Sequence, residues 1–342
     1  MRKRAIVFLL GVAVFFSFPR VSAAQWAQTG GRVFISRNGG TTRVAAKPGS
    51  TIMGLSSLSV VGTDLYAGVW SRVLVSRDEG ATWMELGSAI PSGFVHGVVS
   101  EGPNLFAWSG EQVGLQHRLV ARSTDKGVAW KPIDSGLTSQ GVIEVECLVV
   151  KEKTLFAGAM GGVFVTADSG ASWKAVGSGL PRWVNCLLVS GQNLFAGTWG
   201  GGIYLSTNDG AGWTEINQGL PTEARVYCLA TMGAKIYAGI LEGGVYVTAD
   251  NGASWTSASI GLPERISNLQ LAVSGQQLFL GTYEEGVYLS INNGASWTPL
   301  NSGLPPQTHV LCIVASGTNL FAGTSNGGVW RLPLSDITTE KR

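Results

Sequence analysis

Apolar and polar positions recur along this chain in one repeated phrase, which is clearest when residues 193–221 are compared with residues 277–305. In the first of these copies, an uninterrupted apolar run at 184–189 is typical of a strand buried on both faces. Three further strands are predicted near 193–197, 202–206 and 212–216. Each copy therefore predicts four antiparallel strands, named A to D from the inside outward.

The period of the repeat favours a β-propeller. The turn between strands C and D opens with a serine or threonine, at Ser36, Ser76, Ser123, Thr166, Ser206, Thr248 and Ser290. The intervals are 40, 47, 43, 40, 42 and 42 residues, and a period near 40–45 residues with four strands per unit is typical of propeller blades. Because seven A–B strand pairs can be found, we predict an all-β fold of seven four-stranded blades.

The two ends of the chain are predicted to close the ring. The last copy stops after its third strand, at 329–332, whereas residues 32–46 carry a C–D turn motif with no A–B pair before it. N-terminal and C-terminal strands can therefore share one blade, which removes free sheet edges. The sequence leaves open which N-terminal strand completes that blade.

The turn motif S/T-x-D/N-x-G-x-x-W predicts a structural role. Clear copies occupy residues 76–83, 123–130, 166–173, 206–213, 248–255 and 290–297. The copy at 36–43 is degenerate and ends in Arg43 instead of tryptophan. A short Asp or Asn can accept backbone N–H bonds in its own turn, and glycine permits positive φ. The tryptophan can cover the turn and satisfy its N–H locally.

We therefore predict that the acidic residues of these turns determine the fold and act neither as catalytic acids nor as metal ligands. These residues are Asp78, Asp125, Asp168 and Asp250. In the copy at 206–213, Asn208 occupies the same position.

The turns resemble those of the Asp-box, or BNR, repeat family, over about residues 30–335. Sialidases of this kind have six blades and an arginine triad, which cannot be placed on this sequence residue by residue. Xyloglucan hydrolases pair two propellers across a cleft, whereas this chain has one. The chain is similar in type to the seven-bladed photosystem II assembly factor, and this resemblance implies a module that binds proteins.

The N-terminal segment differs from everything that follows it. A basic start, Arg2 to Arg4, precedes a fourteen-residue apolar run at 5–18 and small residues up to Ala23. This pattern predicts a secretory signal peptide cleaved after Ala23, and the run falls short of the roughly 20 residues that an uncleaved membrane anchor needs. The predicted parts are a signal peptide at 1–23, one propeller domain at 24–336 and a short tail at 337–342. We expect a secreted or periplasmic protein.

Composition and charge narrow the range of partners. The chain holds 48 glycines, 12 tryptophans and only 13% charged residues, which favours short strands joined by tight turns. Residues 1–23 hold four of the 24 basic residues and none of the 22 acidic ones, so the net charge changes from +2 to −2 without them. A nearly neutral domain gives no electrostatic reason to expect nucleic acid or anionic lipid as a partner.

Two loop positions vary strongly between copies that otherwise repeat closely. They lie in the B–C and D–A loops, which share the face opposite the turn motifs because antiparallel strands alternate in direction. At the entry to strand A the copies carry Gly54, Phe94, Glu144, Trp183, Arg225, Ser267 and His309. After strand B they carry Trp70, Gly110, Met160, Trp199, Leu241, Tyr283 and Ser325. Aromatic residues beside arginines are typical of binding hot spots.

We therefore predict a partner-binding site on this face. Its candidate residues are Trp70, Glu111, His117, Arg118, Trp183, Trp199, Arg225, Arg265, Tyr283 and Glu284. Other interpretations stay open: neutral variation in exposed loops, or filling of the central channel by Trp70 or Trp183. The arginines could bind a carboxylate of a ligand or pair with glutamates nearby in the loops, which are Glu223, Glu264, Glu284 and Glu285.

The remaining reactive residues predict neither a metal centre nor a cofactor. The four cysteines share one position of strand A: Cys147, Cys186, Cys228 and Cys312. Equivalent positions of neighbouring blades should be too far apart for disulfides, so small buried thiols are predicted. The three histidines fit no metal or nucleophile–base spacing. A hydrolytic carboxylate pair would have to come from loop glutamates, with Glu242 and Glu284 or Glu285 as candidates.

Together these patterns predict a monomeric, non-catalytic propeller that binds a protein or peptide through its B–C and D–A loops. The alternative is a glycan-binding or glycoside-hydrolysing protein that uses the loop aromatics as sugar platforms and the loop glutamates as acids. A third hypothesis is a purely structural component of the cell envelope, because fold analogy alone does not assign a function.

Overall fold

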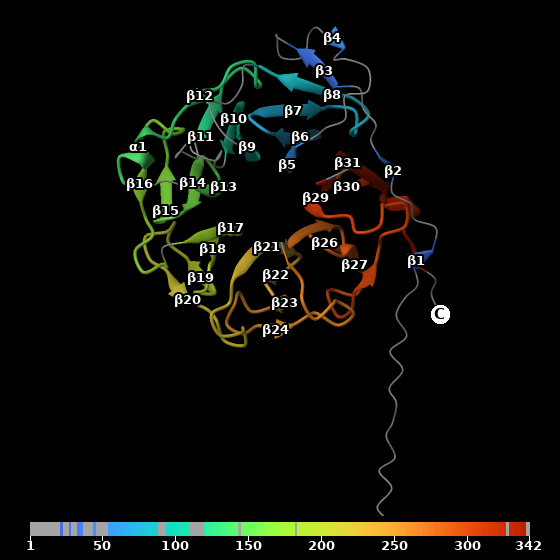
Figure 1. Cartoon of the computed structure of the whole chain (residues 1–342). Coiled ribbons are helices and arrows are strands. Elements are labelled where there is room, and N and C mark those ends of the chain that lie inside the picture. Colours follow the sequence, from blue (N-terminus) through green and yellow to red (C-terminus); the bar gives the residue numbers. More distant parts are fainter. Residues whose placement is uncertain are drawn as a thin grey trace, which may run out of the picture.

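The computed structural model describes residues 54–87, 94–109, 120–142, 145–181, 183–267, 269–325 and 328–339, together with four short N-terminal strands. Seven sheets follow one another around a ring, each with its first strand nearest the ring axis (Figure 1). Each blade contains four antiparallel strands in the order A to D, and two further strands extend the sheet of blade 1. The chain is thus a seven-bladed β-propeller, as the repeat predicts.

The blades are numbered along the chain. Blade 1 contains β5 (Leu55–Val61), β6 (Asp64–Val69), β7 (Arg72–Ser76) and β8 (Trp83–Leu86). Blade 2 contains β9 (Val95–Glu101), β10 (Asn104–Ser109), β11 (Val120–Ser123) and β12 (Lys131–Pro132). Blade 3 contains β13 (Val145–Lys151), β14 (Thr154–Ala159), β15 (Gly162–Thr166) and β16 (Lys174–Ala175). Blade 4 contains β17 (Val184–Ser190), β18 (Asn193–Thr198), β19 (Ile203–Ser206) and β20 (Thr214–Glu215).

The remaining blades follow the same pattern. Blade 5 contains β21 (Val226–Met232), β22 (Lys235–Ile240), β23 (Gly244–Thr248) and β24 (Thr256–Ser257). Blade 6 contains β25 (Gln270–Ser274), β26 (Gln277–Thr282), β27 (Gly286–Ser290) and β28 (Thr298–Pro299). Blade 7 contains β29 (Val310–Ser316), β30 (Asn319–Thr324), β31 (Gly328–Pro333) and β2 (Ala27–Gln28). A short helix, α1 (Ser135–Thr138), follows β12, and a 3-10 turn, η1 (Leu334–Asp336), follows β31.

Ring closure joins the two ends of the chain in blade 7. Strand β2 pairs antiparallel with β31, with Ala27 opposite Arg331 and Gln28 opposite Trp330. The predicted sharing of one blade is confirmed, and β2 is the N-terminal strand that completes it. Another short strand, β1 (Val21–Ser22), pairs with β32 (Thr338–Thr339), so the predicted cleavage after Ala23 would remove β1 from the mature chain.

The strands that flank the degenerate turn motif take no part in this closure. Its flanking strands, β3 (Val33–Ser36) and β4 (Val44–Ala45), form a hairpin that extends blade 1 to six strands. Strand β3 runs parallel to β8, with Val33 opposite Trp83. Strands β3 and β4 therefore belong to the outer edge of blade 1, whereas the closing strand β2 lies upstream of them in the chain.

The cysteine position of strand A faces a glycine of strand B. Cys147 lies opposite Gly158, and a Cβ at that glycine would come within 2.6 Å of the sulfur. In blade 2 the sizes are exchanged, because Gly97 lies opposite Trp108 and a Cβ on Gly97 would meet its indole at 2.1 Å. One member of each pair is small, and in blade 6 the glycine of strand B, Gly281, faces the larger Gln270.

The four cysteines are free. Burial raises the pKa of Cys147, Cys228 and Cys312 to about 12, and it raises the pKa of Cys186 well above 9.0. Since the thiolate is the reactive species, we expect no labelling by Ellman's reagent at pH 8 in the native state and four labelled thiols after unfolding in guanidinium. Fast labelling of the native protein would contradict the raised pKa of these thiols.

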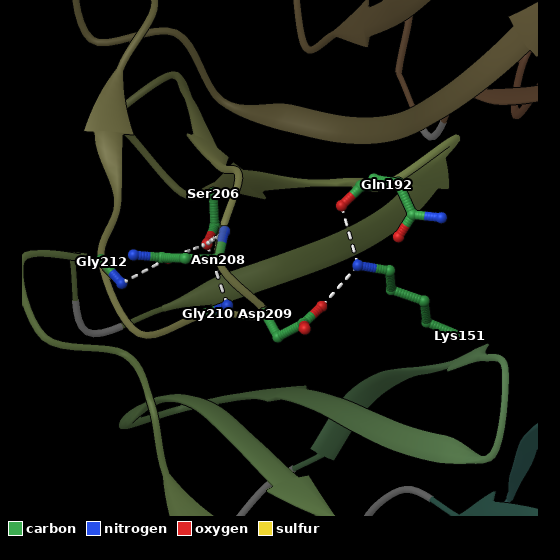
Figure 2. Close-up of polar contacts among 7 residues, drawn as sticks. All are labelled: Lys151, Gln192, Ser206, Asn208, Asp209, Gly210 and Gly212. Carbon is green, nitrogen blue, oxygen red and sulfur yellow. Dashed lines mark hydrogen bonds and ion pairs between the residues drawn. The ribbon is translucent and has the colours of Figure 1, made fainter.

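Each turn motif from residue 76 onward closes its own hairpin through its first and third residues. In blade 4, the Ser206 hydroxyl donates to Asn208 Oδ1 at 2.9 Å and accepts the backbone N–H of Gly210 at 2.9 Å. Asn208 Oδ1 also accepts the N–H of Gly212 at 2.9 Å (Figure 2). Asp168 and Asp250 make the same bonds in blades 3 and 5. The predicted structural role of the motif is borne out by these contacts.

The tryptophan of the motif bonds to the neighbouring blade, which corrects the prediction of a local partner. In blades 3 to 6 its indole N–H donates to the carbonyl of the residue that follows strand D of the preceding blade, whereas the buried Nε1 atoms of Trp83 and Trp130 have no acceptor. These bonds join Trp173 to Ile133 (2.8 Å), Trp213 to Val176 (2.9 Å), Trp255 to Ile216 (2.8 Å) and Trp297 to Ala258 (2.7 Å). The indole is long enough to reach this carbonyl across the seam.

Two further contacts strengthen this link between blades. The motif glycine packs against the same strand D, because a Cβ on Gly170 would lie 2.2 Å from Ile133 Cδ1. The residue before the glycine often bonds to the preceding blade, as Asp209 does to Lys151 (Figure 2). Lys151 also donates to the Gln192 carbonyl at 2.8 Å. The turn motifs of blades 3 to 6 thus act as latches between consecutive blades.

The acidic latches make stability depend on pH. Hydrogen bonds from hydroxyl and backbone donors lower the pKa of Asp168 and of Asp250 from 3.8 to about 2. A carboxylate whose pKa is lower in the folded state stabilises the fold above the unfolded pKa, and this contribution is lost as the pH falls towards 2. We therefore expect the free energy of unfolding to fall between pH 4 and pH 2.

The double variant D168N/D250N tests this expectation. Asparagine already serves in this position, since Asn292 accepts the Ser296 N–H and donates to its hydroxyl. The variant should fold and lose less stability than the native chain between pH 4 and pH 2, as measured by urea denaturation. An equal loss in both proteins would contradict the assignment.

Candidate binding face

The two variable loop positions lie side by side at the same end of every blade that can be examined. Within one blade, the residue after strand B donates its N–H to the carbonyl at the entry to strand A. These bonds link Trp70 to Gly54 (3.2 Å), Trp199 to Trp183 (3.1 Å), Leu241 to Arg225 (3.0 Å), Tyr283 to Ser267 (3.1 Å) and Ser325 to His309 (3.1 Å). Since these positions follow strand B and precede strand A, they share the face opposite the latches, which we call the loop face.

The same positions also meet across the seams between blades. Trp70 of blade 1 packs on Phe94 of blade 2 with ring centroids 5.1 Å apart. Tyr283 of blade 6 stacks on His309 of blade 7 at 4.2 Å. Two isolated β-bridges pair Met160 with Trp183 and Trp199 with Arg225. We call these four contacts the seam pairs, and the sequence gives no sign of them because their members lie about two dozen residues apart.

Exposure sets this face apart from the rest of the surface. Five large apolar side chains are classed as exposed among the described residues. Four of them occupy the position after strand B: Trp70 (49%), Met160 (37%), Trp199 (38%) and Tyr283 (36%). The fifth, Ile260 (51%), follows strand D and is not part of a seam pair. Burial in the core does not account for the four residues after strand B, which lie together on the loop face.

The largest aromatic group lies over blades 3 to 5. The Trp183 and Trp199 rings stack at 5.7 Å, and Trp199 meets Tyr227 at 5.6 Å. The Arg225 guanidinium lies over the Trp199 ring at 5.5 Å, within range of a cation–π contact. Glu146 accepts the Trp183 indole N–H at 3.1 Å. We call these five residues together with Met160 the Trp199 cluster.

Sequence reasoning missed Glu146 and Tyr227. Both precede the cysteine position, where the A–B register shifts by one residue. The shift is a β-bulge, which turns a side chain away from its normal direction and is common beside functional sites. The corresponding bulged residues in other blades are Ser56, His96, Asn185 and Leu311. The position before the cysteine is polar in several copies of an otherwise apolar strand, and this is the signal that could have found it.

The charged candidate residues that the structure describes on the loop face do not form ion pairs with one another. Arg225, Arg265 and Glu284 are exposed. The ion pairs found in the described part of the chain are Arg72–Glu85, Arg77–Asp64 and Lys151–Asp209, none of which lies on this face. The interpretation that the loop arginines pair with nearby glutamates therefore has no support in the described ranges.

A surface pocket of about 630 Å³ adjoins the Tyr283–His309 pair. It lies between the B–C loop of blade 6 and the D–A loop that leads into blade 7. Its lining includes Glu284, Glu285, Asn301, Thr308 and His309. The Asn301 side chain already binds the backbone of its own blade, because its Oδ1 accepts the Val287 N–H at 2.7 Å. The two glutamates and His309 are the groups that a ligand could reach.

Some predicted site residues lie outside the described part of the chain. These are Glu111, His117 and Arg118 of the long B–C loop in blade 2. Within the described ranges, no group of three or more histidine, cysteine, aspartate and glutamate side chains is placed to hold a metal ion. No described helix is long and apolar enough to cross a bilayer.

A protein-family model matches more than half of the chain. The model is the DUF6242 beta propeller domain, and it matches residues 107–228 and again residues 195–331, which overlap. Together the two matched ranges span blades 2 to 7, so they include every residue of the Trp199 cluster. Comparison of the sequence with curated proteins found no significant match.

Solved structures with the same fold include binding proteins. YCF48 from Cyanidioschyzon merolae is similar with 15% identity and a TM-score of 0.64, over 91% of this chain and 98% of that one. YCF48 bound to D1 peptide is similar with 15% identity and a TM-score of 0.62, over 83% of this chain and 94% of that one. The extracellular domain of BT4673 from B. thetaiotaomicron has 14% identity and a TM-score of 0.63, over 82% of this chain but 38% of that one. At these identities the similarity shows the fold alone.

Proposed function

We propose that this chain, which belongs to the DUF6242 beta propeller domain family, is a non-catalytic module that binds a protein or peptide segment through its loop face. The observation that carries the proposal is the exposure of four large apolar side chains at one repeated position, after strand B. A repeat protein can vary one position of every blade without changing its core, so function concentrates where the copies differ.

The Trp199 cluster supports this function most directly. Protein-binding hot spots are enriched in tryptophan, tyrosine and arginine and lie in the centre of an interface. Trp183, Trp199, Arg225 and Tyr227 contact one another from two adjacent blades. Backbone bonds to strands A and B hold this platform in place before a partner arrives, which lowers the entropy cost of binding.

The triple variant W199A/Y283A/R225A tests the proposal. All three side chains are exposed, so the variant should fold with an unchanged melting temperature, whereas its affinity for the native partner should fall at least tenfold. The partner would be isolated on immobilised residues 24–342 from an envelope extract, purified, and then titrated by calorimetry. The matched control is I260A, which removes an exposed apolar side chain elsewhere and should bind as the native chain does. Equal affinity of the triple variant would contradict the proposal.

Glycan binding is a second candidate, and the pocket beside Tyr283 favours it. An exposed aromatic ring next to two carboxylates, Glu284 and Glu285, could stack on a sugar ring and accept bonds from its hydroxyl groups. This function predicts retention on a glycan array that Y283A abolishes and W199A leaves unchanged. Retention of no glycan, or equal loss in both variants, would remove this candidate.

We also propose that the protein acts outside the cytoplasm. Support comes from the N-terminal pattern of residues 1–23 and from the extracellular domains that share the fold, such as that of BT4673. Expression of the full chain in its source cell should yield a periplasmic or secreted protein whose first residue is Ala24, as read by intact-mass spectrometry. A cytosolic protein that retains residues 1–23 would contradict this.

A further inference from the structure

We propose that the partner segment presents a carboxylate to Arg225, flanked by apolar side chains that cover Trp183, Trp199 and Tyr227. This inference rests on the proposed function and specifies the chemistry of the partner at one point of the loop face. It follows from how Arg225 is held and from which of its bonds are still open.

The backbone of Arg225 is fixed from two sides. Its carbonyl accepts the Leu241 N–H at 3.0 Å within blade 5, and the residue forms a bridge to Trp199 of blade 4. Its guanidinium carbon lies 5.5 Å from the centre of the Trp199 ring. A guanidinium over an aromatic face keeps its N–H groups directed outward from its edges, so the side chain is oriented but not yet saturated.

No acceptor among the described residues satisfies the Arg225 side chain. Among the described residues it forms neither an ion pair nor a hydrogen bond, and its charge faces water. Glu146, the carboxylate within the cluster, is engaged with the Trp183 indole. Glu223 and Glu242 lie in loops of the same blade, are exposed and also form no ion pair with Arg225. The five N–H donors of this guanidinium therefore remain open to a ligand.

The charges of Arg225 and Glu146 both affect the pKa of the Tyr227 hydroxyl. Burial is the largest cause that raises the pKa of the Tyr227 hydroxyl, Arg225 lowers it and Glu146 raises it further. Both charges thus lie near this ring without pairing to each other. The cluster contains a preoriented cation inside an apolar platform rather than a neutralised ion pair.

A partner that covers the aromatic rings must also cover the guanidinium between them. Removing water from an arginine without supplying acceptors costs free energy that the apolar contacts would have to offset. A carboxylate matches the fork of the guanidinium and can accept two parallel bonds. An amide or carbonyl supplies weaker acceptors, and an ammonium group supplies none. The partner chemistry that fits is therefore an acidic group between apolar residues.

Three N-acetylated, C-amidated tripeptides serve as probes: Phe-Asp-Phe, Phe-Asn-Phe and Phe-Lys-Phe. Their affinities for residues 24–342 can be measured by NMR titration of the tryptophan indole N–H signals. We expect the Asp peptide to bind at least tenfold more tightly than the Lys peptide and severalfold more tightly than the Asn peptide. R225Q should abolish this preference while retaining apolar binding, whereas W199A should weaken all three peptides.

R77Q is the matched control, since Arg77 is an exposed arginine in the turn motif of blade 1, on the face opposite the loop face. It should keep the native preference. Equal affinities for the three peptides, tighter binding of the Lys peptide, or a preference that survives R225Q would overturn the carboxylate inference while the binding platform stands. The absence of any shift with all three peptides would overturn both this inference and the role of the Trp199 cluster in the proposed function.

Discussion

Replacing Trp297 by alanine is expected to destabilise the propeller by about 3–5 kcal/mol, the range for removing a large buried aromatic side chain. The Trp297 indole is 1% exposed and belongs to the core between blades 5 and 6. Its Nε1 donates to the Ala258 carbonyl at 2.7 Å, so the variant also leaves that buried carbonyl unpaired. The measurement is the free energy of unfolding in urea at pH 7.

A pair of phenylalanine variants separates the hydrogen bond from the apolar packing. In W297F the bond to Ala258 is lost, whereas in W130F nothing comparable is lost, because the buried Trp130 Nε1 has no acceptor. Both changes replace the same indole by the same ring. We expect W297F to cost about 1–3 kcal/mol more than W130F, the range for stranding a buried polar group. Equal costs would mean that the latch bond adds no stability.

Replacing Gly252 by alanine is expected to cost about 2–5 kcal/mol. The residue has a φ of +91°, where a side chain costs about 1–2 kcal/mol. Its new Cβ would also come within 2.2 Å of Ile216 Cδ1 on strand D of the preceding blade. Overpacking of this kind adds about 1–3 kcal/mol. Urea denaturation of G252A measures the sum.

Gly200 supplies a matched control for the backbone effect. Its φ is +92°, and a Cβ there would meet nothing within 4 Å. G200A should therefore show the backbone cost alone, and the difference between the two variants gives the cost of contact with Ile216. If G252A is no less stable than G200A, the turn glycine does not serve as a packing surface between blades.

The sequence predicts the blades well because their determinants are local. The apolar run of strand A, the Ala-Gly of strand B and the turn motif all act within some forty residues, and the strand bounds of blade 4 agree with the expected ranges within a few residues. Strand D is the exception, since 212–216 was expected and β20 is only Thr214–Glu215. The turn bonds of Asn208 extend to Gly212 and shorten the strand that follows.

The sequence identified most residues of the candidate site, but it did not predict which of them contact one another. Internal comparison identified Trp183, Trp199 and Arg225 because copies of one repeat act as references for one another. It could not show that Trp199 meets Arg225 and Tyr227, since these contacts cross a seam between blades. Glu146 was missed because a bulge, rather than the strand alternation, directs its side chain.

What the sequence by itself determined is the repeated unit: seven blades, their strand order, and a motif that closes its own turn. The contacts between neighbouring blades were decided by the tertiary structure alone. In the folded chain, β2 completes the closing blade. Motif tryptophans donate to carbonyls of the preceding blade. The seam pairs of the loop face also form only when neighbouring blades pack together. The physical reason is that hydrophobic periodicity and turn chemistry act along the chain, whereas contacts between blades depend on how the ring closes.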